Sequence, residues 1–259
     1  MKLKFLGTGG GRYATGKQLR KTGGIIVKTD ETQIHIDPGP GALVETHSEL
    51  EKPEDTEAII VSHGHPDHSN DAEPIIEMMT HCFEHPGTVF ASESVLSGFG
   101  EIEKGISTYH QNLCGKVKTL EEGTEVEFKD VKIESQQMFH SDPRTQGFTI
   151  ETGEKRIGFW TDTEYSEELL DLYEGCDTMV IYCSRPRSNE IPSHTSIEKV
   201  PDIIKSVQPQ TAILTHFGSK FLESDMEAER EWIEEKVESK VILAEDGMEF
   251  PGNRSLGDF

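Results

Sequence analysis

The stretch from residue 61 to residue 71, VSHGHPDHSND, constrains this chain more than any other. It places three of the eleven histidines and one aspartate within six positions, directly after the apolar run AIIV. Imidazoles crowded this closely repel one another when protonated, and they are poor material for a core. A loop can turn such side chains towards one point, whereas a strand sends residues at odd spacing to opposite faces. The motif therefore predicts a loop that binds a divalent cation through His63, His65, Asp67 and His68. The alternative is a histidine-rich surface loop.

Three further polar residues stand at the ends of other apolar runs. His140 follows ESQQMF, Asp162 follows RIGFWT, and His216 follows TAILT. At a strand end, a side chain can point into a crevice that several strands share. Asp162 offers two carboxylate oxygens and is the natural bridge between two ions. Together with the loop, these residues predict a binuclear centre with open positions for water, which is typical of catalytic rather than structural metal sites.

The overall charge limits the partners of the chain. Its 259 residues include 25 Lys and Arg against 48 Asp and Glu, a net charge of −23. Because phosphate backbones are bound through Lys and Arg, this balance argues against extended nucleic acid as a partner. Seven basic residues and no acidic one fall between positions 1 and 29. Such asymmetry can draw a small anion towards one face, although chance placement on a solvated loop explains it equally well.

The sequence also indicates where in the cell the protein is located. No apolar run approaches the roughly 20 residues that span a bilayer. Met1 leads straight into the strand-like MKLKFLG rather than into a signal peptide. The four cysteines, Cys82, Cys114, Cys176 and Cys183, form no CxxC pair, which favours reduced and mostly buried thiols. We therefore expect a cytoplasmic protein with no membrane segment.

Short apolar runs alternate with turn signals and amphipathic stretches along the chain. KLKFLG, GGIIVKT, TQIHID and EAIIVS read as strands of a first half, followed by a helix with Pro74 in its first turn. A second series of strands runs from VFASE to TAILTHF, with a helix over TSIEKVPDIIKSV. We expect a charged surface helix over Glu223–Val237 and a last strand or hairpin in KVILAEDGMEF. Two β-rich halves with interspersed helices predict a single αββα sandwich of α/β (α+β) class over residues 1–259.

The motifs SHGHPDH, FHSD, WTDT, SHTS and LTHFGSKF together resemble those of the metallo-β-lactamase superfamily, specifically its ribonuclease Z-like phosphodiesterase branch. FLGTGGG and IDPGPGA resemble the opening strands of that superfamily, so the similarity covers most of the chain. The resemblance implies the four-layer metallo-β-lactamase sandwich and two divalent metal ions. Carried over motif by motif, it assigns His63, His65 and His140 to the first ion and Asp67, His68 and His216 to the second. Asp162 would bridge the two ions.

In this branch the histidine of an H-x-S/T element such as SHTS donates a proton and does not bind metal, which maps to His194. A leaving alkoxide needs a proton, and histidine is matched to that task near neutral pH. The resemblance thus implies His194 and Asp67 as catalytic residues. The alternative for His194 is a histidine at a helix N-terminus with no catalytic part.

The spacing of the motifs narrows the function. Ribonuclease Z enzymes carry a long tRNA-binding arm between the third-motif histidine and the bridging aspartate, whereas His140 and Asp162 are only 22 residues apart. The compact spacing is more similar to the phosphoribosyl cyclic phosphodiesterase of the phosphonate pathway. The predicted function is a binuclear metal-dependent phosphodiesterase for a small or cyclic phosphodiester. Alternatives are an RNA-processing nuclease of ribonuclease Z type, a non-haem iron redox enzyme and a non-catalytic metal-binding protein.

Several details stay open at this point. His and carboxylate ligands accept Zn²⁺, Mn²⁺, Fe²⁺ and Ni²⁺, of which Zn²⁺ or Mn²⁺ is expected. Relatives in the branch are often homodimers. Arg185, Arg187 and Lys220 are candidate substrate-binding residues, because arginine binds phosphate in a bidentate manner and Lys220 closely follows His216. Their alternative role is plain surface charge. Asp37 is expected to order the neighbouring loop from behind the ligands.

Overall fold

Two β-sheets form the centre of the computed structural model, which describes residues 1–153 and 155–251. The first sheet has seven strands in the order β14-β1-β2-β3-β4-β5-β6. These strands are β1 (Lys2–Phe5), β2 (Ile25–Lys28), β3 (Gln33–Ile36), β4 (Ala58–Val61), β5 (Thr88–Ser92), β6 (Lys116–Leu120) and β14 (Glu249–Phe250). Ile and Val dominate the buried β2 and β4, as expected of strands covered on both faces, whereas β6 (KVKTL) at one edge of the sheet is largely exposed.

The second sheet also has seven strands, in the order β13-β12-β11-β10-β9-β8-β7. They are β7 (Thr124–Phe128), β8 (Val131–Gln137), β9 (Gln146–Thr152), β10 (Lys155–Trp160), β11 (Thr178–Tyr182), β12 (Thr211–Thr215) and β13 (Lys240–Leu243). A tight hairpin joins β7 to β8, with Phe128 paired to Val131.

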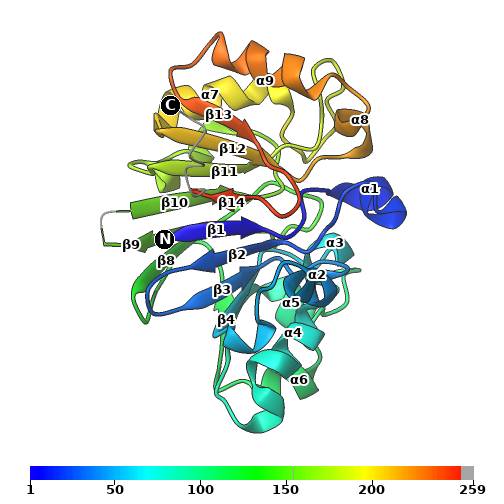
Figure 1. The fold of residues 1–259 in the computed structure, drawn as a ribbon, viewed down its shortest axis with the longest axis vertical. Coiled ribbons are helices and arrows are strands. Elements are labelled where there is room, and N and C mark those ends of the chain that lie inside the picture. Colours follow the sequence, from blue (N-terminus) through cyan, green and yellow to red (C-terminus); the bar gives the residue numbers. More distant parts are fainter. Residues whose placement is uncertain (154, 252–259) are drawn as a thin grey trace.

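Helices cover the outer faces of both sheets (Figure 1). They are α1 (Gly11–Lys17), α2 (Ala42–Ser48), α3 (Pro66–Ser69), α4 (Ala72–Met79), α5 (Glu93–Ser97), α6 (Thr108–Leu113), α7 (Val200–Val207), α8 (Ser219–Leu222) and α9 (Met226–Glu234). Helices α2 to α6 lie beside the first sheet, and α7 and α9 lie beside the second. The layers therefore follow the order helix, sheet, sheet, helix, which confirms the predicted αββα sandwich.

Three apolar clusters separate these layers. One fills the space between the two sheets and includes the stacked rings of Phe148 and Phe159, 5.0 Å apart. A second lies between the second sheet and its helices, around Trp160 and Tyr173. The third lies between the first sheet and its helices, around Ile75 and Ile76 of α4. Burial of these side chains is the main force that holds the four layers together.

Strand direction brings several loops to one edge of the sandwich. Strands β3 to β6 run parallel to one another, and so do strands β10 to β13. Strand β8 is antiparallel to β9, which is antiparallel to β10, so β8 and β10 point the same way. Because ligands bind beyond the carboxyl ends of such strands, the loops after β4, β8, β10, β11 and β12 are placed to build one site.

The C-terminal part of the chain differs from the sequence expectation. KVILAEDGMEF does not form a single strand or a hairpin: β13 pairs with β12 in the second sheet, whereas β14 pairs with β1 in the first. The short connection therefore crosses between the sheets. The expected surface helix is shorter than Glu223–Val237, because α9 begins after Asp225, whose carboxylate accepts a hydrogen bond from the amide of Ala228 at 3.1 Å.

The cysteines agree with the expectation where the structure describes them. Cys176 and Cys183 are buried and free, and Cys114 is half-buried and free. The side chain of Cys82 lies outside the described part of the chain. Among residues 1–153 and 155–251, no helix combines the length and apolar character needed to cross a bilayer.

Candidate metal centre

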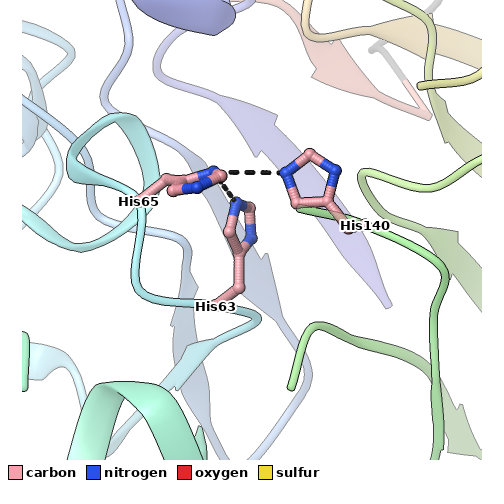
Figure 2. Close-up of side chains that lie close together, drawn as sticks. All are labelled: His63, His65 and His140. Carbon is pink, nitrogen blue, oxygen red and sulfur yellow. Dashed lines mark hydrogen bonds between the residues drawn. The ribbon is translucent and has the colours of Figure 1, made fainter. Parts of the chain in front are cut away.

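Three histidines from two sheets converge at the first cluster (Figure 2). His63 and His65 follow β4 of the first sheet, and His140 follows β8 of the second. His65 Nδ1 lies 2.9 Å from His63 Nε2 and 3.2 Å from His140 Nε2. The structure thus brings together the three residues that the sequence assigned to the first ion.

Hydrogen bonds behind two of these rings set their tautomers. The carbonyl of Ser193 accepts a hydrogen bond from His140 Nδ1 at 2.7 Å. Ser62 Oγ donates to Asp37 at 2.9 Å and is therefore the acceptor for His63 Nδ1, 3.0 Å away. In both rings Nδ1 carries the proton, so the lone pair of Nε2 faces the cluster. A metal ligand needs this arrangement of its imidazole.

The second cluster consists of Asp67, His68 and His216. Asp67 and His68 lie on the short helix α3, and His216 follows β12 of the opposite sheet. His216 Nε2 lies 3.0 Å from His68 Nε2 and 3.4 Å from Asp67 Oδ2. The amide of Gly11, at the start of α1, donates to the same Asp67 oxygen at 2.7 Å. This contact fixes the carboxylate from the side of the basic N-terminal segment.

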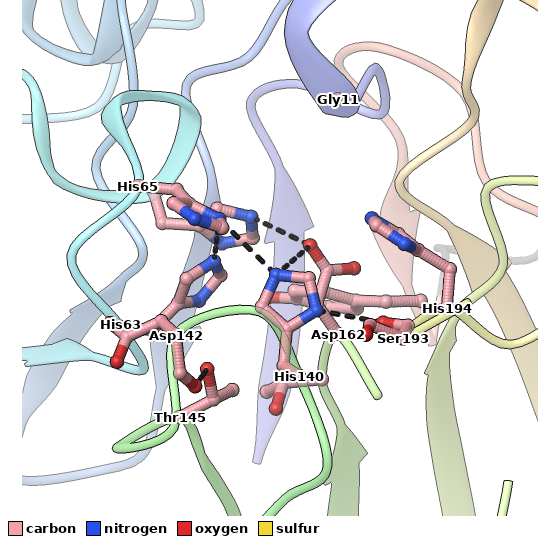
Figure 3. A network of polar contacts seen from close by, with 12 residues as sticks. Gly11, His63, His65, His140, Asp142, Thr145, Asp162, Ser193 and His194 are labelled. Atoms are coloured by element: carbon pink, nitrogen blue, oxygen red, sulfur yellow. Dashed lines mark hydrogen bonds and ion pairs between the residues drawn. The ribbon is translucent and has the colours of Figure 1, made fainter. Parts of the chain in front are cut away.

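Asp162 reaches residues of both clusters, and Figure 3 shows it beside His140 of the first. Its Oδ2 atom is 3.3 Å from His68 Nε2 and 3.9 Å from His140 Nε2, and its Oδ1 atom is 3.2 Å from His216 Nδ1. Oxygen and nitrogen atoms of His63, His68 and Asp162 also lie within 4.8 Å of one another. The carboxylate therefore reaches ligands of both clusters, as a bridging residue must.

Asp37 orders the centre from behind, as its sequence position suggested. Its Oδ1 accepts the amide of Ser62 at 2.7 Å, and its Oδ2 accepts His68 Nδ1 at 3.0 Å. The hydroxyl of Tyr182, at the end of β11, donates to the same Oδ2 at 3.1 Å. Sequence reasoning missed Ser62 and Tyr182, because each reads as an ordinary residue at the end of an apolar strand.

His194 lies beside the first cluster. Its ring centroid is 4.9 Å from that of His140, and its ring approaches Asp162 closely enough to share a metal-sized space with both residues. Its Nδ1 donates to the carbonyl of Pro192 at 3.1 Å, which leaves Nε2 as the nitrogen free to exchange a proton. The structure thus places His194 beside the candidate ligands, and its role as a proton donor stays a prediction.

The segment that carries His194 is attached to the segment that carries Asp162. Trp160 Nε1 donates to Thr195 Oγ1 at 2.9 Å, and that hydroxyl donates to the carbonyl of Thr163 at 3.0 Å. Trp160, Thr163 and Thr195 are all buried. The motifs WTDT and SHTS are thus tied together, which restrains the separation of His194 and Asp162.

The charge states of most ligands suit a cation, and His68 is the exception: burial lowers its pKa, but Asp67 and Asp37 outweigh burial and raise it well above its usual value, so an ion bound there would displace a proton. Burial lowers the pKa of His63 well below its usual value and that of His140 to about 4, so both imidazoles are neutral near pH 7. Burial alone would raise the pKa of Asp67 and of Asp162, but the neighbouring His68 and His216 outweigh it and hold both pKa values below their usual range. Neutral imidazoles and ionised carboxylates are the forms that bind divalent metal.

The residues present therefore fit the two divalent ions that the sequence predicts. The donor set comprises His nitrogens and Asp oxygens in two groups that share one carboxylate, and three imidazoles have a tautomer fixed from behind. Such ligands suit Zn²⁺, Mn²⁺ or Fe²⁺. His63, His65 and His140 would hold one ion, and Asp67, His68 and His216 the other, with Asp162 between them.

Asp142, which follows the ligand His140 in FHSD, was missed as a site residue. Its Oδ2 accepts the amide of Gly64 at 2.9 Å and the hydroxyl of Ser94 at 2.6 Å. Gly64 stands between the ligands His63 and His65. Asp142 thus ties the loop after β8 to the loop after β4 and keeps histidines from the two sheets together.

The predicted substrate-binding residues have different surroundings. Arg187 points to α9, where its Nε donates to Glu229 at 2.7 Å and its guanidinium lies 5.2 Å from the ring centroid of Trp232. Arg187 is thus engaged by α9, and a role in binding substrate stays a prediction for it. Lys220 is exposed and pairs with Glu223 at 2.7 Å. Arg185 is half-buried in the loop that leads to His194, so a role in binding substrate stays a prediction for it.

Much of the basic N-terminal segment is neutralised by the neighbouring helix α2 and the turn that follows it. Lys4 pairs with Glu49 at 2.9 Å, Lys21 pairs with Glu45, and Lys28 pairs with Glu51. Part of the basic charge of the N-terminal segment is therefore used in ion pairs that hold it against α2 and the turn after it.

Comparison with known proteins places this centre in context. The model of the "Beta-lactamase superfamily domain" matches residues 32–217. The chain is 36% identical over 251 residues to an uncharacterized protein, MJ1374, of Methanocaldococcus jannaschii, covering 96% of this chain and 94% of that protein.

Two solved structures share the fold. The metallo-beta-lactamase fold protein YhfI from Bacillus subtilis has a TM-score of 0.79 at 16% identity, covering 96% of this chain and 98% of that one. A diphosphatase from the PhnP family has a TM-score of 0.70 at 16% identity, covering 97% and 98%. At such identities these structures establish the fold.

Proposed function

The chain belongs to the beta-lactamase superfamily, and we propose that it is a binuclear metal-dependent phosphodiesterase that acts on a small or cyclic phosphodiester. One observation carries the proposal: two clusters of metal-binding side chains share Asp162, and His194 stands beside them without being needed for either set of three ligands. In a two-metal hydrolytic centre the cations stabilise the attacking and leaving oxygens, and a separate proton donor can serve the leaving group.

Two divalent ions bound by these residues would polarise the phosphoryl oxygens and bring the pKa of a water molecule close to neutral. The protein's own contribution is to hold the ligand side chains in fixed orientations. Ser62, Asp37 and the Ser193 carbonyl orient the imidazoles, while the Gly11 amide holds the Asp67 carboxylate.

His194 would protonate the oxygen of the leaving alcohol. Its Nδ1 proton is engaged by the Pro192 carbonyl, so the proton that it delivers sits on Nε2 of the imidazolium. Delivery from a fixed ring avoids the formation of a free alkoxide, whose high basicity would otherwise limit the rate. Because Ser193 holds His140 and the next residue is His194, the donor and a ligand are placed by one short segment.

Two features support a small substrate. The interval between His140 and Asp162 is occupied by β9 and β10, which pair directly with each other inside the sheet, where a tRNA-binding arm would have to emerge. The net charge of −23 disfavours a long polyanion. The fold is shared with a PhnP-family diphosphatase, whose name records cleavage of a phosphate linkage in that protein.

The proposal is tested with a panel of substrates. Chelator-stripped protein is reconstituted with Zn²⁺, Mn²⁺ or Fe²⁺ and assayed against bis(p-nitrophenyl) phosphate, a 2′,3′-cyclic nucleotide, p-nitrophenyl phosphate, a thioester and a β-lactam. We expect metal-dependent cleavage of the two diesters only. Cleavage of the thioester or the β-lactam alone would overturn the proposal, and oxygen consumption by the iron form without hydrolysis would favour the redox alternative.

A further inference from the structure

Tyr182 is a buried aromatic residue whose ring lies against two ligands of the second cluster. Its ring plane is within 6° of that of His216 at a centroid separation of 5.2 Å, and within 26° of that of His68 at 5.9 Å. Only 4% of Tyr182 is exposed. Offset stacking at these separations favours one orientation of each imidazole over the alternatives.

The other end of Tyr182 acts on the same cluster. Its hydroxyl donates to Asp37 Oδ2, the oxygen that also accepts the hydrogen bond from His68 Nδ1. His68 is therefore restrained twice: its ring is stacked by the tyrosine, and the carboxylate that sets its tautomer is held by the tyrosine hydroxyl. His216 has a left-handed backbone, with φ of 61°, so stacking also supports a side chain on a less favoured backbone conformation.

The first cluster is held by different means. Its rings pack edge to face against each other, with centroids of His63 and His65 4.6 Å apart and those of His65 and His140 5.0 Å apart. The backs of its rings are fixed by Ser62 and by the Ser193 carbonyl. The two clusters therefore differ in the groups that support their rings, although they share Asp37 and Asp162 and the rings of His63 and His68 lie 4.1 Å apart.

We propose that Tyr182 is a positioning residue that sets the affinity of the Asp67–His68–His216 position for its ion, and leaves the His63–His65–His140 position largely unaffected. This inference rests on the proposed binuclear centre. It does not depend on which substrate is cleaved, because the property concerned is the binding of the second ion. Tyr182 would thereby decide whether the protein carries one ion or two at limiting metal concentration.

The test is a titration of stripped protein with Zn²⁺ in competition with a chromophoric chelator. Tyr182→Phe keeps the stacked ring and removes the hydroxyl, whereas Tyr182→Leu removes both. Loss of a group that orients metal ligands typically weakens metal binding by about 10- to 100-fold. We expect that loss in only one of the two binding steps of Tyr182→Phe, a larger loss in the same step of Tyr182→Leu, and an unchanged other step in both.

Tyr173→Phe is the matched control. Tyr173 is equally buried, and its hydroxyl donates to the carbonyl of Phe159 at 3.0 Å, in the cluster between the second sheet and its helices. We expect wild-type binding in both steps. If both Tyr182 variants bind Zn²⁺ with the affinities of the wild type, the proposal is overturned. An equal loss of affinity in both binding steps would also overturn it. If Tyr182→Leu does not fold, Tyr182→Phe alone decides.

The proposed role of Tyr182 and the proposed phosphodiesterase function are contradicted by different results. A wild-type protein that binds fewer than two ions overturns the binuclear centre and the role of Tyr182 together. Two-ion binding that depends on Tyr182, without cleavage of any phosphodiester, upholds the role of Tyr182 and removes only the proposed substrate.

Discussion

His68 and His216 are 148 residues apart in the sequence and belong to opposite sheets, yet their Nε2 atoms lie 3.0 Å apart. The same is true of the first cluster, where His65 of the first sheet meets His140 of the second. Each cluster is therefore complete only when the two sheets are packed face to face. Metal binding and the stability of the sandwich are coupled as a consequence.

Removal of metal should lower the thermal stability of the protein. An ion that binds only the folded state stabilises it by about 2.7 kcal/mol when its concentration is 100 times its Kd. We expect a lower Tm after chelation and recovery on addition of Zn²⁺ or Mn²⁺, measured by calorimetry. Asp162→Ala, which removes the residue shared by both clusters, should show little response to metal. An identical Tm with and without metal would contradict the coupling.

His194→Ala should lose turnover and keep metal. A positioned general acid contributes about 10²- to 10⁴-fold to a rate, so kcat should fall by that order. The metal content, measured by elemental analysis, should equal that of the wild type, because the three ligands of each cluster remain. Loss of an ion from this variant would instead make His194 a ligand, and full activity would remove it from the mechanism.

Gly10→Ala should damage the second cluster, because a Cβ at this position would overlap the imidazole of His216. We expect loss of the ion held by His216, seen as a lower metal stoichiometry. Gly16→Ala is the control, since a Cβ there meets no other atom within 4 Å. Alanine at position 16, inside α1, should be neutral or stabilise the helix by up to about 1 kcal/mol. Equal metal contents in the two variants would refute the close packing at Gly10.

His35 should make the folded state sensitive to acid. It is fully buried, its Nε2 donates to the carbonyl of Gly23 at 2.7 Å, and burial lowers its pKa to about 4. The unfolded chain, with a histidine pKa of about 6.5, then binds more protons between pH 6.5 and pH 4. The free energy of unfolding is therefore unaffected by this group above pH 6.5. As the pH falls towards 4, it decreases by on the order of 3 kcal/mol.

The measurement for this prediction is urea unfolding of chelator-treated protein at pH 7.0, 5.5 and 4.5, beside His35→Gln. Glutamine can donate to the Gly23 carbonyl but does not titrate. Its free energy of unfolding should therefore change less with pH than that of the wild type. Parallel pH dependences would show that other groups determine the response to acid.

The ligands were predictable because their spacing is local and their chemistry is unusual. The run from His63 to His68 is recognisable in any fold, and His140, Asp162 and His216 each end an apolar strand, so parallel strand ends were enough to bring them together. Asp37 was predictable for the same reason.

The supports of the centre were not predictable in the same way. Tyr182 ends the apolar run TMVIY and looks like a core residue until the tertiary structure places its hydroxyl on Asp37. The ion pair of Arg187 was not predictable either, because its partner, Glu229, lies 42 residues away on α9. The crossing from β13 to β14 reads as a hairpin, since nothing in AEDGM distinguishes a turn within a sheet from a connection between sheets.

The central claim is that two ions act together in the cleavage of a phosphodiester. The most direct measurement is the rate of nitrophenol release from bis(p-nitrophenyl) phosphate as stripped protein receives increasing equivalents of Zn²⁺ or Mn²⁺. We expect the rate to rise mainly with the second equivalent and to level off once two ions are bound. Full activity with one ion, or no release from protein shown to hold two, would contradict the account.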